Sequence, residues 1–296
     1  MLVNGSDCSI VIKTAHHEKD IPYSDETLRE DIKILEEKAS IEGDGVCRGL
    51  RKVCGITGCV VTPLTIKNAP LLLFVAMGAA GTPVLVSETR NLYKYDLNLI
   101  PMEDTEGFFI IQDRKNERRI FEGCRVKRFE LRIFSNETIK LKLDISGDCI
   151  PRVYQDLGIV QSQASEMSGT VIGRERFHSD FVKYQINGQE YTNIYGLTIT
   201  AKKEGGTKTK IMIKRALQCG TDLPAVIEDM TITAFLIRDK YECRFFGAFR
   251  ITISKLVLVS DGTEVNTDGA VISPIRYFVF GGVKAEVFTN TGELLP

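Results

Sequence analysis

The sequence predicts a mainly β fold made of two β-sandwich units, each built on a four-strand meander, with one or two short helices. Two segments of the chain alternate apolar and charged residues with a period of two, as half-buried strands do. Turns such as Asn187-Gly188 and Asp261-Gly262 separate the short apolar runs. Few stretches have the apolar spacing of a helix, so we expect strands to dominate.

The composition is typical of a globular protein with little net charge. Of 296 residues, 43% are hydrophobic and 26% are charged, which argues against a disordered chain. The 38 Lys and Arg nearly balance the 39 Asp and Glu, leaving a formal charge of −1. The whole chain therefore lacks the basic field of a nucleic-acid-binding protein, and copies of it repel each other little.

No segment predicts a membrane span or a secretory signal. The longest apolar stretch, Ala69–Gly81, is interrupted by Pro70 and Gly78 and is shorter than the roughly 18 residues that suggest a transmembrane helix. The first residues lack a basic region followed by an apolar core, so we expect synthesis and folding in the cytosol.

The cysteines are predicted to be reduced and mostly buried, because no Cys-x-x-Cys pair occurs and the residues are widely spread. We expect no zinc site among them. They are Cys8, Cys47, Cys54, Cys59, Cys124, Cys149, Cys219 and Cys243.

The first 60 residues are the least regular part and are predicted to form an N-terminal arm with a loop-rich connection to the first domain. Ser24-Asp25-Glu26 precedes Leu28, Ile32 and Leu35 in a pattern that predicts a short capped helix. The glycine-rich run Gly43–Gly58 is expected to interrupt regular structure.

A second, buried helix is predicted over residues 68–77. Asn68 is placed to be its N-cap and Pro70 lies in its first turn. Gly78 and Gly81-Thr82-Pro83 are expected to end it. We expect this helix to pack on the sheet.

The first meander is predicted between residues 108 and 145. Phe108–Ile111 and Arg119–Phe121 flank the polar turn Arg114-Lys115-Asn116, and a second hairpin turns at Ser135-Asn136-Glu137. The second hairpin has one apolar and one charged face. Its apolar positions are Phe129, Leu131, Ile133, Ile139, Leu141, Leu143 and Ile145, and its charged positions include Arg128, Glu130, Arg132, Lys140, Lys142 and Asp144.

A similar layout recurs about 70 residues later, which suggests an internal duplication. Phe181–Gln185 and Glu190–Thr192 surround Asn187-Gly188, a strong type I′ turn signal. The next hairpin turns at Glu204-Gly205-Gly206-Thr207. Its apolar positions are Leu197, Ile199, Ala201, Ile211 and Ile213, and they alternate with Thr198, Thr200, Lys202, Lys210, Met212 and Lys214.

Further strands are predicted to the C-terminus, at Met230–Ile237, Tyr241–Phe249, Ile251–Val259, Ile275–Phe280 and Val283–Phe288. The predicted division is an arm at 1–60, a first β domain at 61–160 and a second at 161–296. The Ser-, Gln- and Gly-rich segment Gln161–Gly173 is a candidate linker between the two domains.

The residues offer little catalytic chemistry. There are three histidines, and the adjacency of His178, Ser179 and Asp180 argues against a triad, whose members come from distant segments. We find no Gly-x-Ser-x-Gly elbow, Walker A loop or Rossmann fingerprint. The sequence therefore predicts no enzyme, no cofactor and no metal.

The basic residues of the first meander do not by themselves predict nucleic-acid binding. They share their face with Glu130, Glu137 and Asp144, and no aromatic residue among them is placed to stack on a base. A mixed-charge face of this kind is solvated or pairs with a neighbouring subunit.

Part of the first meander resembles a stretch found in the tail tube proteins of long-tailed bacteriophages. Gly123–Leu131 gives a "Gly, polar, Val" start and an alternating strand, and Leu141–Gly147 gives a second strand that ends in Asp144, Ile145, Ser146 and Gly147. The hairpin before Gly123, the Leu-rich helix closed by Gly78 and the Ile272-Ser273-Pro274 segment also match in order. The resemblance covers residues 60–290.

The resemblance implies a siphovirus-type tail tube, or major tail, protein with tail-tube-like β-sandwiches whose meander strands join those of neighbours in a ring. Stacked rings would form a hollow conduit for double-stranded DNA. The implied partners are further copies of the chain, the tape-measure protein and other tail proteins. The implied location is the virion tail, assembled in the cytoplasm of the bacterial host. The meander positions expected to line or join the ring are Phe129, Leu131, Ile133, Ile139, Leu141, Leu143, Lys140, Lys142, Leu197, Ile199, Ile211 and Ile213.

The family builds sixfold rings, so three chains would suffice if each half is a complete fold and six if the halves form one unit. The resemblance also implies a net-negative lumen, whereas the first meander carries more Arg and Lys than Asp and Glu.

Two alternatives remain open. The first is a related tail part, such as a distal tail or tail-terminator protein, or the tube of a phage-derived injection machine. The second is a carbohydrate-binding or adhesion β-sandwich, which would expose aromatic residues to sugars; the chain contains no Trp.

Overall fold

The computed structural model describes residues 8–15, 18–37, 48–88, 92–114, 117–147, 152–155, 176–216, 223–235, 249–262, 264–265 and 271–289. The predicted mainly β fold is confirmed: strands dominate the described residues, and α1 (Ala69–Met77) is the only α-helix among them. Two short 3₁₀ turns, η2 (Met102–Asp104) and η4 (Ser179–Phe181), accompany it.

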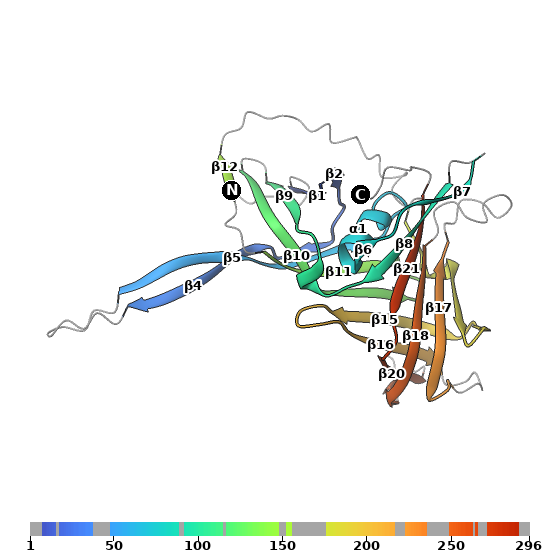
Figure 1. Cartoon of the computed structure of the whole chain (residues 1–296). Helices are drawn as coiled ribbons and strands as arrows, with labels where there is room; N and C mark the ends of the chain where they lie inside the picture. The colour runs from blue at the N-terminus through green and yellow to red at the C-terminus, as the bar shows by residue number, and fades with distance from the viewer. Residues whose placement is uncertain are drawn as a thin grey trace.

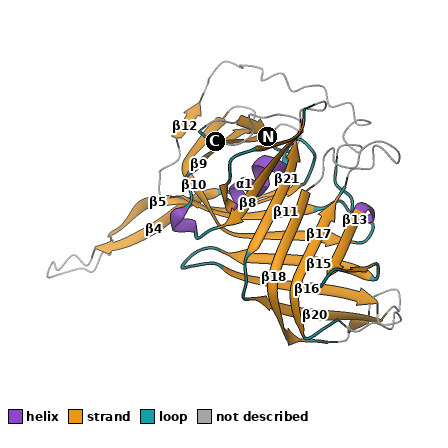
Figure 2. Cartoon of the chain, turned by 45° about the vertical axis from the view of Figure 1, so that its right-hand side comes forward, coloured by secondary structure: helices purple, strands orange, loops and turns teal. Residues whose placement is uncertain are grey.

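All strand pairs are antiparallel, and the strands form two main layers whose directions cross (Figure 2). The first layer has the order β4 (Arg29–Glu37), β5 (Arg48–Pro63), β11 (Lys140–Gly147), β10 (Glu117–Phe134), β15 (Ile194–Lys202), β16 (Lys208–Ala216) and β20 (Val271–Val279). The second has the order β14 (Gln189–Tyr191), β13 (Val182–Ile186), β17 (Val226–Ala234), β18 (Phe249–Ser260), β21 (Val283–Thr289) and β8 (Leu92–Leu99).

Shorter strands extend these layers. Two of them, β6 (Gly78–Ala80) and β7 (Val84–Ser87), pair with β8, while β3 (Asp25–Glu26) pairs with β5 and β19 (Glu264–Val265) with β20. The N-terminal half of β10 pairs with β9 (Phe108–Arg114) and β12 (Arg152–Gln155), and β9 continues to β1 (Cys8–Lys13) and β2 (Glu18–Asp20).

Strand β18 joins the two layers by turning a corner at Lys255. Its first half pairs with β21 and its second half with β20. Lys255 has φ 54°, and this left-handed residue places both Ser254 and Lys255 outside the core before Leu256 turns back in. A hydrogen bond connects the turn after β20 to this corner: the Gly281 N–H donates to the Ser254 carbonyl at 3.1 Å.

Phe177 makes a second connection between the layers. Phe177 donates from its N–H to the Leu64 carbonyl (3.0 Å) and accepts from the Ile139 N–H (2.9 Å), so it continues the sheet between β5 and β11. Its ring meets that of Phe249 edge to face at 5.0 Å. Apart from Leu92 and Phe288, the buried apolar residues of both layers belong to one large cluster.

Helix α1 packs on β21, β8, β10 and β6, as predicted. Asn68 is its N-cap residue, but its side chain turns backward: Oδ1 accepts from the Thr65 N–H at 2.7 Å, and the amide donates to the Pro63 carbonyl at 3.1 Å. Gly78 ends the helix at φ 102°, as its position predicted.

The helix predicted from Ser24 to Leu35 is wrong. These residues form β3 and β4, because the Ile32, Ile34 alternation and the long pairing with β5 override a weak helical spacing. The expected interruption at Gly43–Gly58 is also wrong for its second part, since Gly49, Gly55 and Gly58 lie inside β5.

Neither meander has four successively paired strands. Arg119–Phe121 and Phe129–Ile133, predicted as separate strands, lie on one strand, β10, which continues through a bulge at Gly123 (φ 64°). In the second segment β13 pairs with β14 through the predicted turn, where Asn187 and Gly188 have φ 50° and 78°, but no pairing joins β14 to β15 in the described residues.

The domain division at residue 160 stays a prediction. Strands from both sides of it pair directly, β10 with β15 and β8 with β21. The candidate linker 161–173 and most of the strand predicted at Tyr241–Phe249 lie outside the described residues.

Candidate functional surfaces

The apolar positions predicted for ring contacts are part of the chain's own core. All ten side chains face inward. Nine lie on β10, β11, β15 or β16, and Ile139 directly precedes β11. The most exposed of them, Phe129, is 4% exposed. Contacts with a neighbour through these strands would therefore be made by the opposite face, where Lys140 and Lys142 lie. The ten are Phe129, Leu131, Ile133, Ile139, Leu141, Leu143, Leu197, Ile199, Ile211 and Ile213.

The strand register places the charged positions of both predicted meanders on one continuous surface. Leu131 faces Leu141 on one side and Ile199 on the other, so their outward-facing neighbours also align. One complete cross-strand row runs through Val61, Lys142, Glu130, Thr200, Lys210 and Phe278. We call the outer surface of β11, β10, β15, β16 and β20 the basic face.

Cations outnumber carboxylates on the basic face. The cations are Arg128, Arg132, Lys140, Lys142, Lys202, Lys208, Lys210, Lys214 and Arg276, and the carboxylates among them are Glu130 and Asp144. Glu117 and Glu122 lie on the N-terminal half of β10, which pairs with β9 and β12 instead of β15. The first meander contributes both signs to this face with an excess of cations, and the lysines of β15 and β16 increase that excess.

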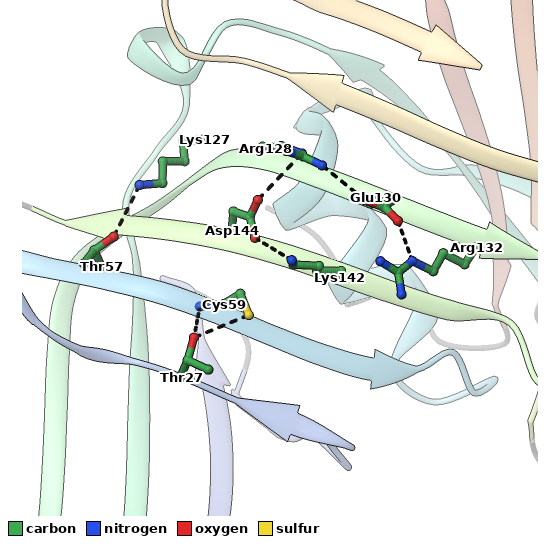
Figure 3. Close-up of polar contacts among 9 residues, drawn as sticks. All are labelled: Thr27, Thr57, Cys59, Lys127, Arg128, Glu130, Arg132, Lys142 and Asp144. Carbon is green, nitrogen blue, oxygen red and sulfur yellow. Dashed lines mark hydrogen bonds and ion pairs between the residues drawn. The ribbon is translucent and has the colours of Figure 1, made fainter. Parts of the chain in front are cut away.

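The two carboxylates, Glu130 and Asp144, lie between the cations of β10 and β11 (Figure 3). Glu130 forms ion pairs with Arg128 (3.3 Å) and Arg132, and Asp144 lies 3.7 Å from both Arg128 and Lys142. The carboxylate side chains are 13% and 22% exposed, against 46% for Arg128 and 42% for Arg132. The outermost charges of this network are therefore positive.

An aromatic ring lies at the end of the basic face, outside the first meander, to which the sequence-based expectation of no stacking aromatic applied. The Lys210 Nζ is 4.9 Å from the centre of the Phe278 ring, a cation–π distance. Phe278 comes from β20, far along the chain, so no local pattern could have associated it with these lysines.

The outer surface of the second layer has a different charge balance. Lys94 lies 3.1 Å from Asp96 and 3.3 Å from Glu286, and Glu286 also meets Arg250 at 3.1 Å. The hydrogen bond to Asp96 raises the pKa of Lys94. Four cations, Lys94, Lys183, Arg250 and Lys284, share this surface with Asp96, Glu190, Glu228, Asp229 and Glu286.

Exposed large apolar side chains concentrate at two places. Of nine in the described part of the chain, three form what we call the β7 patch (Val84, Leu85 and Val86). Five form the β20 patch, where Val226 faces Val257 and Val257 faces Phe278, with Val259 and Phe280 beside them. The ninth is Tyr195. Strand β7 lies at the upper right and β20 at the bottom of Figure 1, so the patches are separate.

Strands β4 and β5 form a ribbon that projects from the body of the molecule (Figure 1). The second half of β5 pairs with β11 inside the first layer, and its first half pairs with β4 along the projection. At the base of the ribbon, the Thr27 Oγ1 accepts a hydrogen bond of 3.0 Å from the Cys59 N–H of β5 (Figure 3). A two-stranded ribbon alone is marginally stable in water, which favours a partner for this one.

The described residues show little that resembles a catalytic centre. The His178 Nδ1 is 3.3 Å from Asp180 in a local turn, and His16 and His17 lie outside the described residues. No cluster of three metal-ligating side chains occurs in the described ranges. Cys59 and Cys124, whose side chains are described, are not joined in a disulfide, and the Cys124 thiol donates to the Phe121 carbonyl at 3.4 Å. None of the helices in this part of the chain is long and apolar enough to span a membrane.

Neither the models of known protein families nor the curated proteins that were searched match this chain.

Proposed function

We propose that this chain is a structural subunit that associates head to tail with copies of itself. The observation that carries this proposal is the presence of two separate apolar patches on one chain. A contact between the β7 patch of one copy and the β20 patch of the next is heterologous, and such contacts generate closed rings or continuing filaments.

The particular assembly we propose is the tail tube of a long-tailed bacteriophage, with stacked rings of three or six chains around a path for DNA. The mainly β fold and the order of the Gly123–Gly147 strands support it, as does the projecting ribbon, which suits a contact with another copy. Tape-measure and other tail proteins would be its partners in the virion tail.

Negative-stain electron microscopy of the purified chain tests the proposal. We expect hollow rings or tubes. Long uniform tubes support a tube subunit, while single closed rings would favour a distal tail or terminator role. A monomer at every concentration contradicts self-assembly.

Paired variants test the β20 patch itself. Val259→Thr with Phe280→Ser removes apolar surface from this patch, and we expect loss of rings or tubes with the fold retained. Tyr195→Ser is the matched control, because Tyr195 is 40% exposed but lies outside both patches. Assembly that survives the double variant, or fails equally in the control, would exclude the β20 patch as a contact.

A further inference from the structure

The basic face has a regular arrangement of cations. Neighbouring strands are about 4.8 Å apart, and outward side chains on one strand repeat every ~7 Å. Lys202 faces Lys208 directly, and Lys210 lies two residues along the same strand. Like charges at such distances repel each other, so this arrangement favours a bound polyanion.

The carboxylates of the basic face do little to neutralise it toward solvent. Glu130 and Asp144 lie between the cations along the strands (Figure 3) and are less exposed than Arg128 and Arg132, and the strands β15, β16 and β20 present no carboxylate on this face. At the ends, Glu137 meets Lys140 at 3.4 Å and Glu204 lies 3.8 Å from Lys202. Lys208, Lys210 and Arg276 are exposed beyond these pairs.

We propose that the basic face binds the phosphate backbone of DNA without regard to base sequence. A nucleic-acid strand presents one negative charge every ~3.4 Å of helix axis, a uniform array that suits a lattice of lysines and arginines. The Lys, Arg and Thr side chains of the face are of the kinds that contact phosphates, and Phe278 with Lys210 offers an aromatic edge.

This activity goes beyond a role as a structural subunit. A tube lined with this face would hold DNA, which departs from the net-negative lumen that the resemblance implies. The proposal does not depend on assembly, because all nine cations belong to one chain.

The test measures binding of a short, fluorescently labelled DNA duplex of arbitrary sequence by anisotropy. We expect binding at about 50 mM salt that weakens steeply by about 200 mM, since counterions are released on association. Lys208→Gln with Lys210→Gln should reduce affinity by about tenfold or more and lower the salt slope by about 2. Lys183→Gln with Lys284→Gln, on the second layer, removes the same charge and should change affinity little.

Three results would overturn the proposal. They are no binding by the wild-type chain at low salt, an equal loss of affinity in both double variants, and competition by poly-glutamate as effective as that by unlabelled DNA at equal charge. Circular dichroism of each variant establishes that it is folded. If rings form but DNA does not bind, this inference fails while the structural-subunit proposal stands.

Discussion

The Nζ of Lys203 donates a hydrogen bond of 3.0 Å to the carbonyl of Ala76, in the last turn of α1. Lys203 follows β15 and its backbone is held on both sides, by the Lys127 carbonyl and the Met102 N–H. Its side chain is fully buried, and burial lowers its pKa from 10.5 to about 8. A cation here meets the negative end of the helix dipole and satisfies a carbonyl that the helix leaves free.

Lys203 should give the protein a distinctive pH dependence. Between pH 8 and 10.5 the unfolded chain binds more protons than the folded one, so the unfolding free energy rises with pH. Relative to Lys203→Met, we expect the wild type to gain about 2 kcal/mol between about pH 7.5 and 9.5. Urea unfolding of both proteins across this interval measures it. A difference that stays constant with pH would show that Lys203 titrates normally.

A side chain at position 281 should lower the stability of the fold. A Cβ there would lie 2.4 Å from the Ser254 carbonyl oxygen, at the corner where β18 changes layers. We expect Gly281→Ala to lower the unfolding free energy by about 1–3 kcal/mol, because the backbone must shift. Gly282→Ala is the control, since a Cβ at Gly282 meets nothing within 4 Å. Equal stability of the two variants in urea titrations would refute the role of this close approach.

The local elements were predictable because their signals are short-range. The alternation around Leu131 and Leu141, the Asn187-Gly188 turn and the helix ended by Gly78 each depend on neighbours in sequence, and each is confirmed. The Ser24–Leu35 helix failed because pairing with β5, a tertiary effect, decides that segment.

The surfaces depend on contacts that a single sequence does not reveal. The basic face exists because β10 pairs with β15, which adds the lysines of one hairpin to the arginines of another. The sequence did not indicate that Lys203 is buried either, since a single lysine after a strand is ordinarily solvated. Lys208, Lys210 and Lys214, which share one side of a strand with Met212, were a usable sign of an exposed cationic strand.

The projecting ribbon should be needed for assembly but not for folding. Removing Lys33–Lys52 and joining Ile32 to Val53 through Asn-Gly keeps the pairs of Arg29–Asp31 with β5. We expect thermal unfolding to change little, since the described parts of the deletion, Lys33–Glu37 and Arg48–Lys52, lie on the projecting ribbon (Figure 1), while rings or tubes no longer form. Sedimentation velocity measures the assembly. Unimpaired assembly would mean that the ribbon makes no essential contact between copies.

Glu130 should weaken DNA binding in the wild-type protein, because it neutralises two arginines of the basic face. Its carboxylate pairs with both Arg128 and Arg132 and is 13% exposed. Glu130→Gln keeps the shape and removes the charge, so we expect tighter DNA binding at low salt. We also expect a loss of about 0.5–1 kcal/mol in unfolding free energy, as for partly exposed ion pairs. Glu286→Gln, which leaves Lys94 and Arg250 on the second layer without this carboxylate, should cost similar stability without changing DNA affinity. If both variants bind DNA equally, the gain comes from net charge, and the basic face has no special part in binding.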